Sequence, residues 1–207
     1  MKLIITRHGE TEENVAGIIQ GHLPGKLSID GIEQAKKVAL RLKNDKFDFI
    51  YSSDLARAAN TAKEIAKYHL NTPIAFIEDL RERDIGEFQG KKRSDLDLDD
   101  KGQKITFIKP KEGETMKDVY KRAKNFLHGI IHKHHNDSVL FVCHGGIGKA
   151  LVAVIIGKKC SELRTVENLQ NTSISTFEID EDKNHKIICY NCVKHLKGKK
   201  GLGVFNK

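Results

Sequence analysis

Residues 138–146 read Ser138-Val139-Leu140-Phe141-Val142-Cys143-His144-Gly145-Gly146, and they contain the most strand-like run in the chain. A short apolar run rich in β-branched and aromatic residues predicts a buried strand. Apolar residues with helical spacing follow over 145–156, so a helix is expected to begin where the strand ends. His144 is therefore predicted to lie at the carboxyl end of a buried strand, at the start of a helix.

The first residues of the chain repeat this arrangement. Lys2–Thr6 is predicted to be a buried strand, and it leads directly into Arg7-His8-Gly9-Glu10-Thr11. Further strands are expected over 47–51, 73–77, 173–179 and 186–190. Helices are expected after Ser28 and Asp54, which are both predicted N-caps, and over 115–135.

Alternating strands and helices predict an α/β fold, here a three-layer α/β/α sandwich with a mainly parallel central sheet. The last two strands are close enough in sequence for a hairpin, so an antiparallel edge strand is expected. The periodicity weakens over about 83–113, where charges are dense, and this segment is predicted to be a small lid insertion. One domain over 1–193 and a basic C-terminal tail over 194–207 complete the predicted organisation.

Composition indicates a globular protein. The chain has 207 residues, of which 39% are hydrophobic and 31% charged, so it can bury a core without disulfides. No apolar run approaches the roughly 18 residues of a membrane span, and the N-terminus does not resemble a signal peptide. Four cysteines are too few for a disulfide framework, so a cytoplasmic location is expected.

The net charge of +8 is concentrated at the C-terminus, where residues 194–207 contain five lysines and no acid. Such a terminus is most often solvated, and charge alone is weak evidence for nucleic-acid binding. We therefore expect neither a nucleic-acid partner nor a membrane partner. The oligomeric state stays open, with a homodimer among the options.

Charged side chains follow three of the predicted strands. The carboxyl ends of parallel strands meet at one edge of a sheet, where ligands bind in open α/β folds. Arg7, His8 and His144 are expected at this edge, and Arg57 lies one turn into the helix that follows another strand. Two arginines, two histidines and the helix N-terminus at Gly145 predict a pocket for a dianion.

These motifs and several others occur in the order found in the histidine phosphatase superfamily, the phosphoglycerate-mutase-like enzymes, which the chain resembles over about residues 2–180. The motifs are Arg7-His8-Gly9-Glu10-Thr11 with Asn14 and Gln20-Gly21, Leu27-Ser28-x-x-Gly31-x-x-Gln34-Ala35, Ser52-Ser53-x-x-x-Arg57-Ala58-x-x-Thr61-Ala62, Leu80-Arg81-Glu82-x-x-x-Gly86-x-x-x-Gly90, Gly113-Glu114-Thr115 with Arg122, Val142-Cys143-His144-Gly145-Gly146, and Asn171-Thr172-Ser173-Ile174.

The resemblance implies a role for each matching residue. His8 matches the nucleophile that becomes phosphorylated, and Glu82 matches the acid that protonates the leaving oxygen. The residues that would hold the phosphoryl oxygens are Arg7, Arg57 and His144, and the further substrate contacts would be Asn14, Gln20, Gly21 and Gly145. These cations take the place that Mg²⁺ has in other phosphoryl-transfer sites, so no cofactor and no metal are expected.

The implied function is that of a metal-independent phosphomonoesterase, a hydrolase whose partner is a small-molecule phosphate ester. The sequence does not identify the ester. One alternative is mutase-type phosphoryl transfer, because mutases share the first half-reaction. Mutases of this family usually have a longer insertion with paired arginines, whereas the stretch here after Gly90 is short and begins Lys91-Lys92-Arg93. Further alternatives are a protein phosphatase and, in a different class, a domain that binds phosphorylated ligands without turnover.

Two other constellations contain cysteine. His185, Cys189, Cys192 and His195 are four potential zinc ligands, but their spacing is irregular for a zinc module. Cys189 and Cys192 would point to opposite faces of a regular strand, so a turn between them would be needed to bring them together. Cys143 lies in an apolar strand and is expected to be inert, because burial raises a thiol pKa.

Overall fold

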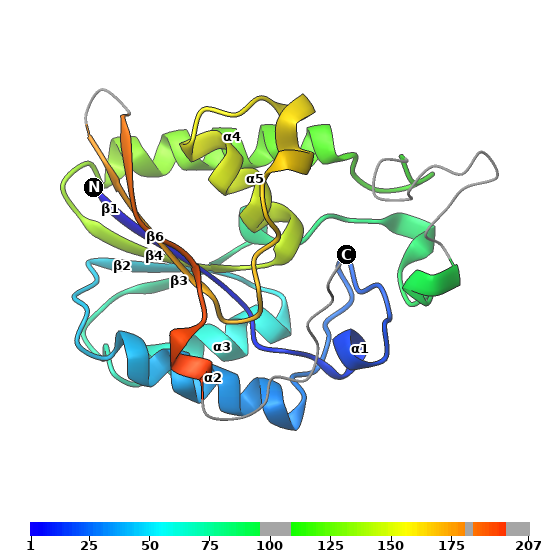
Figure 1. The fold of residues 1–207 in the computed structure, drawn as a ribbon, viewed down its shortest axis with the longest axis horizontal. Helices are drawn as coiled ribbons and strands as arrows, with labels where there is room; N and C mark the ends of the chain where they lie inside the picture. Colours follow the sequence, from blue (N-terminus) through cyan, green and yellow to red (C-terminus); the bar gives the residue numbers. More distant parts are fainter. Residues whose placement is uncertain (96–108, 181–183, 198–207) are drawn as a thin grey trace.

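The computed structural model describes residues 1–95, 109–180 and 184–197, and a six-stranded sheet forms the centre of these described parts (Figure 1). The strand order is β3-β2-β4-β1-β5-β6. The strands are β1 (Lys2–Arg7), β2 (Phe49–Ser53), β3 (Ile74–Ile77), β4 (Ser138–Cys143), β5 (Ile174–Ile179) and β6 (His185–Cys192). Strands β3, β2, β4 and β1 pair in parallel, whereas β5 pairs antiparallel with both β1 and β6.

Helices cover both faces of the sheet (Figure 1). On one face, α2 (Ile29–Leu42) and α3 (Ala56–Ala66) bury apolar residues against Ile4, Ile50 and Val142. On the other face, α4 (Met116–Lys133) and α5 (Gly145–Ile155) pack against the opposite side of the same strands. The predicted three-layer α/β/α sandwich with a mainly parallel sheet is confirmed.

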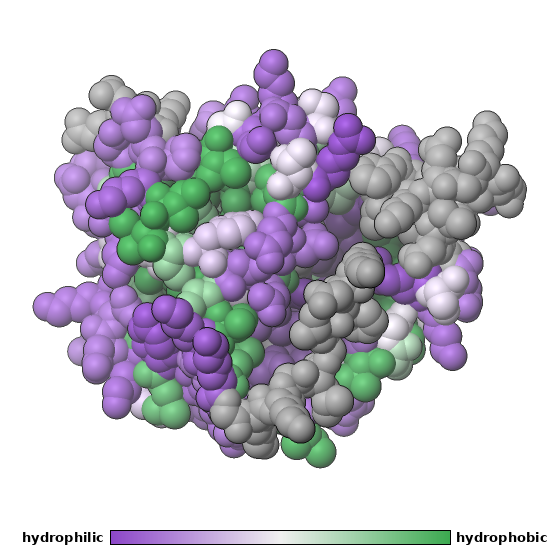
Figure 2. Space-filling model, in the orientation of Figure 1, coloured by the Kyte–Doolittle hydropathy of each residue, from purple (hydrophilic) through white to green (hydrophobic). Residues whose placement is uncertain are grey.

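The predicted antiparallel pairing at one edge is also confirmed. The reversed strand is β5, which lies one place in from the edge strand β6. The face seen in Figure 2 is largely hydrophilic, with apolar side chains at the surface beside this edge. In β6 itself, Ile187 and Ile188 are each about half exposed.

The helix starts agree only in part with the sequence-based expectation. Ser28 caps α2 as predicted, and its side chain accepts the Gly31 N–H. Asp54 does not cap α3, which begins after Leu55 without a side-chain cap. The Asp54 carboxylate is instead paired with the guanidinium of Arg81, a residue distant in sequence. A short helix, α1 (Glu12–Val15), was not expected, and a capping box between Thr11 and Asn14 begins it.

The predicted lid is described only in part. Its described residues include 3₁₀ turns at Gly86–Phe88 and Arg93–Asp95, and residues 96–108 lie outside the described parts. At the C-terminus, Lys194–Leu196 form a 3₁₀ turn, and the rest of the basic tail from 198 on also lies outside them. The lid and tail boundaries therefore stay predictions. Within the described residues, no helix combines the length and apolar character needed to cross a membrane.

Candidate active site

His8 and His144 lie side by side because their strands are neighbours. Strands β1 and β4 pair in parallel with Arg7 opposite Cys143, so each histidine follows at the same edge of the sheet. The two ring centroids are 5.1 Å apart, and both side chains are buried. Burial, with Arg7 and Arg57 nearby, holds the pKa of His8 well below its ordinary value. Burial and then Arg57 lower the pKa of His144 in the same way, so both rings are neutral at pH 7.

The tautomer of His8 follows from one contact. Its Nδ1 lies 2.6 Å from the carbonyl oxygen of Gly9. A carbonyl oxygen can only accept, so Nδ1 carries the proton and Nε2 has the lone pair. The backbone of His8 is held as well, because its N–H donates to Cys143 and its carbonyl accepts from the Asn171 amide at 2.9 Å. His8 therefore presents a fixed, unprotonated Nε2.

Two buried guanidiniums lie close to the histidines. Arg7 Nη1 donates to the carbonyl of Leu169 at 2.8 Å, and Arg57 donates to the carbonyls of Gly21 and Leu23 at 2.8 and 2.6 Å. Burial lowers the pKa of Arg7, and it lowers the pKa of Arg57 to about 10, which still leaves a cation at neutral pH. Within the described residues, Nε of each arginine and both ring nitrogens of His144 are buried without a hydrogen-bond partner.

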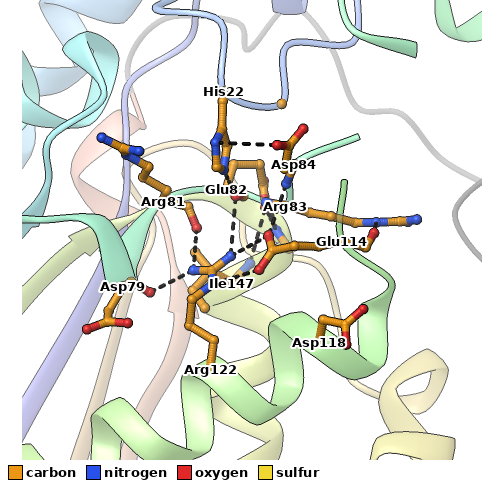
Figure 3. Close-up of polar contacts among 12 residues, drawn as sticks. His22, Asp79, Arg81, Glu82, Arg83, Asp84, Glu114, Asp118, Arg122 and Ile147 are labelled. Atoms are coloured by element: carbon orange, nitrogen blue, oxygen red, sulfur yellow. Dashed lines mark hydrogen bonds and ion pairs between the residues drawn. The ribbon is translucent and has the colours of Figure 1, made fainter. Parts of the chain in front are cut away.

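The Glu82 carboxylate lies at the N-terminus of α5. Gly146 N–H donates to its two oxygens at 3.0 and 2.9 Å, and Ile147 N–H donates at 3.2 Å (Figure 3). The free N–H groups and the dipole of a helix N-terminus favour a negative charge at this position. Glu82 is also close enough to Arg7 to oppose the lowering of the arginine's pKa. The acid that the sequence singled out is thus brought to the two arginines and two histidines.

Arg122 of α4 holds the backbone segment that carries Glu82. Arg122 forms a two-pronged contact with Glu114, with Nε–Oε1 and Nη2–Oε2 distances of 2.9 and 2.7 Å. Its other N–H groups donate to the carbonyls of Asp79, Arg81 and Glu82 at 2.7, 2.9 and 3.4 Å (Figure 3). These contacts use all five guanidinium donors, so the side chain fixes three backbone positions at once.

His22 lies on the other side of the same segment, and the sequence-based selection missed it. Its Nε2 lies 2.8 Å from the Glu82 carbonyl, and its Nδ1 lies 3.9 Å from Asp84 (Figure 3). His22 is also close enough to lower the pKa of His144. The one available signal was its position directly after Gln20-Gly21, but that position does not reveal a contact with residue 82.

The predicted substrate-binding residues surround the same end of the sheet. Gly21 has a φ of 53°, which favours glycine, and this conformation lets its carbonyl accept from Arg57. Gln20 Nε2 donates to Thr11 Oγ1 at 2.9 Å. A Cβ on Gly145 would lie 3.7 Å from Glu82 Oε2, which places this residue beside the acid. Asn14 has a structural task, because its Oδ1 accepts the Thr11 N–H at the start of α1.

The cysteine constellations have different outcomes. Burial raises the pKa of Cys143 to about 12, which confirms the expected inert thiol. His185 lies at the start of β6 and Cys192 at its end. Within the described residues, no group of three or more His, Cys, Asp or Glu side chains could hold a metal ion. The four residues weighed as zinc ligands therefore do not form a common cluster.

Comparison with known proteins agrees with this geometry. Residues 3–192 match the model of the histidine phosphatase superfamily (branch 1). The chain is 33% identical to phosphoglycerate mutase-like protein 4 of Arabidopsis thaliana, over 94% of this chain and 86% of the relative. It is 30% identical to the metal-independent phosphoserine phosphatase of the same plant, over 94% and 83%.

A solved structure provides a further comparison. The phosphoserine phosphatase of Entamoeba histolytica, in complex with 3-phosphoglyceric acid, aligns with a TM-score of 0.81 at 30% identity. The alignment covers 94% of this chain and 98% of that one. Family match, sequence relatives and fold thus agree: the chain belongs to the histidine phosphatase superfamily.

Proposed function

We propose that this chain is a metal-independent phosphomonoesterase that hydrolyses small phosphorylated metabolites through a phosphohistidine formed at His8. The observation that carries the proposal is the fixed Nδ1–H tautomer of His8, which leaves Nε2 unprotonated beside two buried guanidiniums. The family assignment supports it. The phosphatase names of several relatives, one of them described as metal-independent, support the choice of hydrolysis.

In the first step, the lone pair of His8 Nε2 attacks phosphorus and the bond from phosphorus to the ester oxygen breaks. The leaving oxygen takes a proton from Glu82, which enters this step as the protonated carboxyl group. In the second step, water attacks the phosphohistidine, Glu82 takes a proton from that water, and inorganic phosphate leaves. Splitting the reaction through a covalent intermediate replaces one difficult displacement with two easier ones.

The Nε groups of Arg7 and Arg57 and the ring nitrogens of His144, which have no hydrogen-bond partner among the described residues, give the phosphoryl group its contacts. Buried cationic N–H groups without partners are costly, and phosphate oxygens satisfy them with charge-assisted hydrogen bonds. A dianion between the arginines also opposes the burial that keeps His144 neutral, and so favours a protonated ring that donates. Fixed donors of this kind stabilise the charge of the transition state.

The position of Glu82 connects phosphate binding to acid catalysis. In the unliganded site its carboxylate accepts the N–H groups at the start of α5. A bound phosphate oxygen competes for the same helix N-terminus. Glu82 is then released from these contacts and turns to the leaving oxygen of the substrate.

Arg93 would provide a contact for a second acidic group on the substrate. Arg93 lies close enough to Arg7 to lower its pKa, so a further cation stands beside the phosphate pocket. A carboxylate placed near a phosphate, as in phosphoserine or 3-phosphoglycerate, would meet both charges. The 3-phosphoglyceric acid complex of the amoebal phosphatase supports this class of substrate. A cytoplasmic location and a single domain over 1–193 are parts of the same proposal.

Mutase activity is the second candidate, because one relative is named phosphoglycerate mutase-like. A mutase passes the phosphoryl group to another oxygen of a retained intermediate, so the difference lies in the lid and not in His8. The deciding assay compares release of inorganic phosphate with interconversion of 2- and 3-phosphoglycerate. We expect release from a panel of phosphomonoesters to be faster than interconversion, with phosphorylated acids the best substrates. Faster interconversion would overturn the assignment.

A further inference from the structure

The two C-terminal cysteines are brought to one face of the sheet by a bulge in β6. Thr176 of β5 pairs with Cys189, and Ile174 pairs with Cys192, so β5 advances two residues while β6 advances three. The extra residue is accommodated where Asn191 adopts a φ of 49°. Cys192 therefore takes the place that residue 191 has in a regular ladder. Cys189 packs with Ile174 on the α2 side of the sheet, and Cys192 pairs with Ile174 in the ladder.

The two thiols interact across this bulge. The Cys192 thiol lies close enough to Cys189 to raise the pKa of the Cys189 thiol, and Cys189 Sγ donates to the carbonyl of Ile174 at 3.2 Å. Both cysteines are partly buried, and both are free thiols. The two cysteines pair with residues two ladder steps apart. Two steps separate Cα atoms by about 7 Å, near the upper end of the roughly 4.4–6.8 Å that disulfides span.

Asn191, inside the same bulge, supports the loop that holds Arg7. Its Oδ1 accepts the Gln170 N–H at 2.9 Å, and its Nδ2 donates to the Asn168 carbonyl at 3.1 Å. The carbonyl of Leu169, between them, accepts from Arg7 Nη1 at 2.8 Å. Asn191 is therefore connected to a guanidinium of the active site through two consecutive contacts.

We propose that Cys189 and Cys192 are a redox-sensitive pair, and that their disulfide lowers the affinity of the active site for the phosphate group through Asn191 and Leu169. The oxidant belongs to the peroxide class. The Cys192 thiolate attacks one oxygen of hydrogen peroxide, giving a sulfenic acid and, after proton uptake, water. The Cys189 thiol then attacks the sulfenic sulfur and releases a second water. In total, two thiols and one peroxide yield one disulfide and two waters.

The order of these steps follows from the surroundings of Cys189. Burial raises the pKa of the Cys189 thiol, the neighbouring Cys192 raises it further, and Arg41 of α2 acts in the opposite direction. The raised pKa keeps Cys189 in the thiol form, and it therefore serves as the resolving partner. Closing a disulfide over 189–192 requires the bulge to rearrange, and this displaces Asn191 from the 168–170 loop.

The test treats the purified full chain with hydrogen peroxide and then with dithiothreitol. Peptide mass spectrometry is expected to find a disulfide between Cys189 and Cys192, with the loss of two hydrogens. Activity toward p-nitrophenyl phosphate should fall several-fold through a higher KM and return after reduction. Cys189→Ser and Cys192→Ser should retain their activity in peroxide, whereas Cys160→Ser, at a partly buried thiol elsewhere, should be inhibited like the wild type.

Three results would overturn the inference. They are the absence of this disulfide in the oxidised protein, formation of the disulfide with unchanged KM, and equal inhibition of Cys189→Ser. The activity readout rests on the proposed function, but the disulfide does not. A chain that forms the disulfide and has no phosphatase activity before oxidation would count against the proposed function alone.

Discussion

At the scale of single residues, the chemistry of the site depends on which atoms already have a hydrogen-bond partner. His8 Nδ1 donates to the Gly9 carbonyl, so only Nε2 can attack. The carboxylate of Glu82 accepts N–H groups of α5 before substrate binds. The sequence predicted both residues from their motifs. It could not predict the hydrogen bond between Glu82 and Gly146, because these two residues are 64 positions apart in the sequence.

The role of Glu82 as a proton donor predicts a dependence on the leaving group. Glu82→Gln keeps the shape but cannot donate a proton in this way, and general acid catalysis contributes about 10²–10⁴-fold. We expect kcat/KM for alkyl phosphates, which reports the phosphorylation step, to fall by at least about 10²-fold, while that for p-nitrophenyl phosphate changes little because nitrophenolate leaves unaided. The measurement is steady-state kinetics on both substrate types. An equal loss on both would contradict the assignment.

At the scale of elements, the sheet edge was predictable and the segments around it were not. A buried strand followed directly by a histidine and a glycine occurs at β1 and β4, and parallel pairing makes these two ends meet. The Asp54 pairing with Arg81, the contact of His22 with residue 82 and the bulge at Asn191 each depend on tertiary packing. Local sequence patterns carry no signal for such contacts.

The contact between α4 and the Glu82 segment leads to a prediction about positioning. Arg122→Lys keeps the charge but cannot bond Glu114 and three carbonyls together. We expect kcat/KM for alkyl phosphates to fall by about tenfold, less than the roughly 10²-fold of a proton transfer lost outright, with that for p-nitrophenyl phosphate little affected. Lys121→Ala, on an exposed position of the same helix, is the matched control and should be neutral. Equal slowing of both substrates would indicate a general structural role.

At the scale of the whole molecule, burial of neutral histidines couples stability to pH. Burial holds the pKa values of His8 and His144 well below the ordinary value, and it lowers that of His195 to about 4. Below pH 6.5 the unfolded chain therefore binds protons that the folded chain does not. Protonation of the unfolded chain therefore lowers the free energy of unfolding, and stability decreases as the pH falls below about 6.5.

The corresponding measurement is Tm by thermal unfolding between pH 7.5 and pH 5. We expect Tm to fall toward pH 5, and to fall less steeply in His144→Asn. His135→Gln, at an exposed histidine outside the site, should keep the slope of the wild type. A Tm that rises as the pH falls would show that the two site histidines are not buried in neutral form.

The account rests on His8 as the nucleophile, and the most direct measurement is the position of the covalent phosphoryl group. The protein is mixed with a labelled phosphomonoester, quenched in alkali, which preserves phosphohistidine, and mapped by peptide mass spectrometry. The account predicts label on His8 at Nε2, because Nδ1 donates to Gly9, and no label in His8→Ala, which should also lack turnover. Label on Cys143, on a hydroxyl residue or on His144 in place of His8 would contradict it.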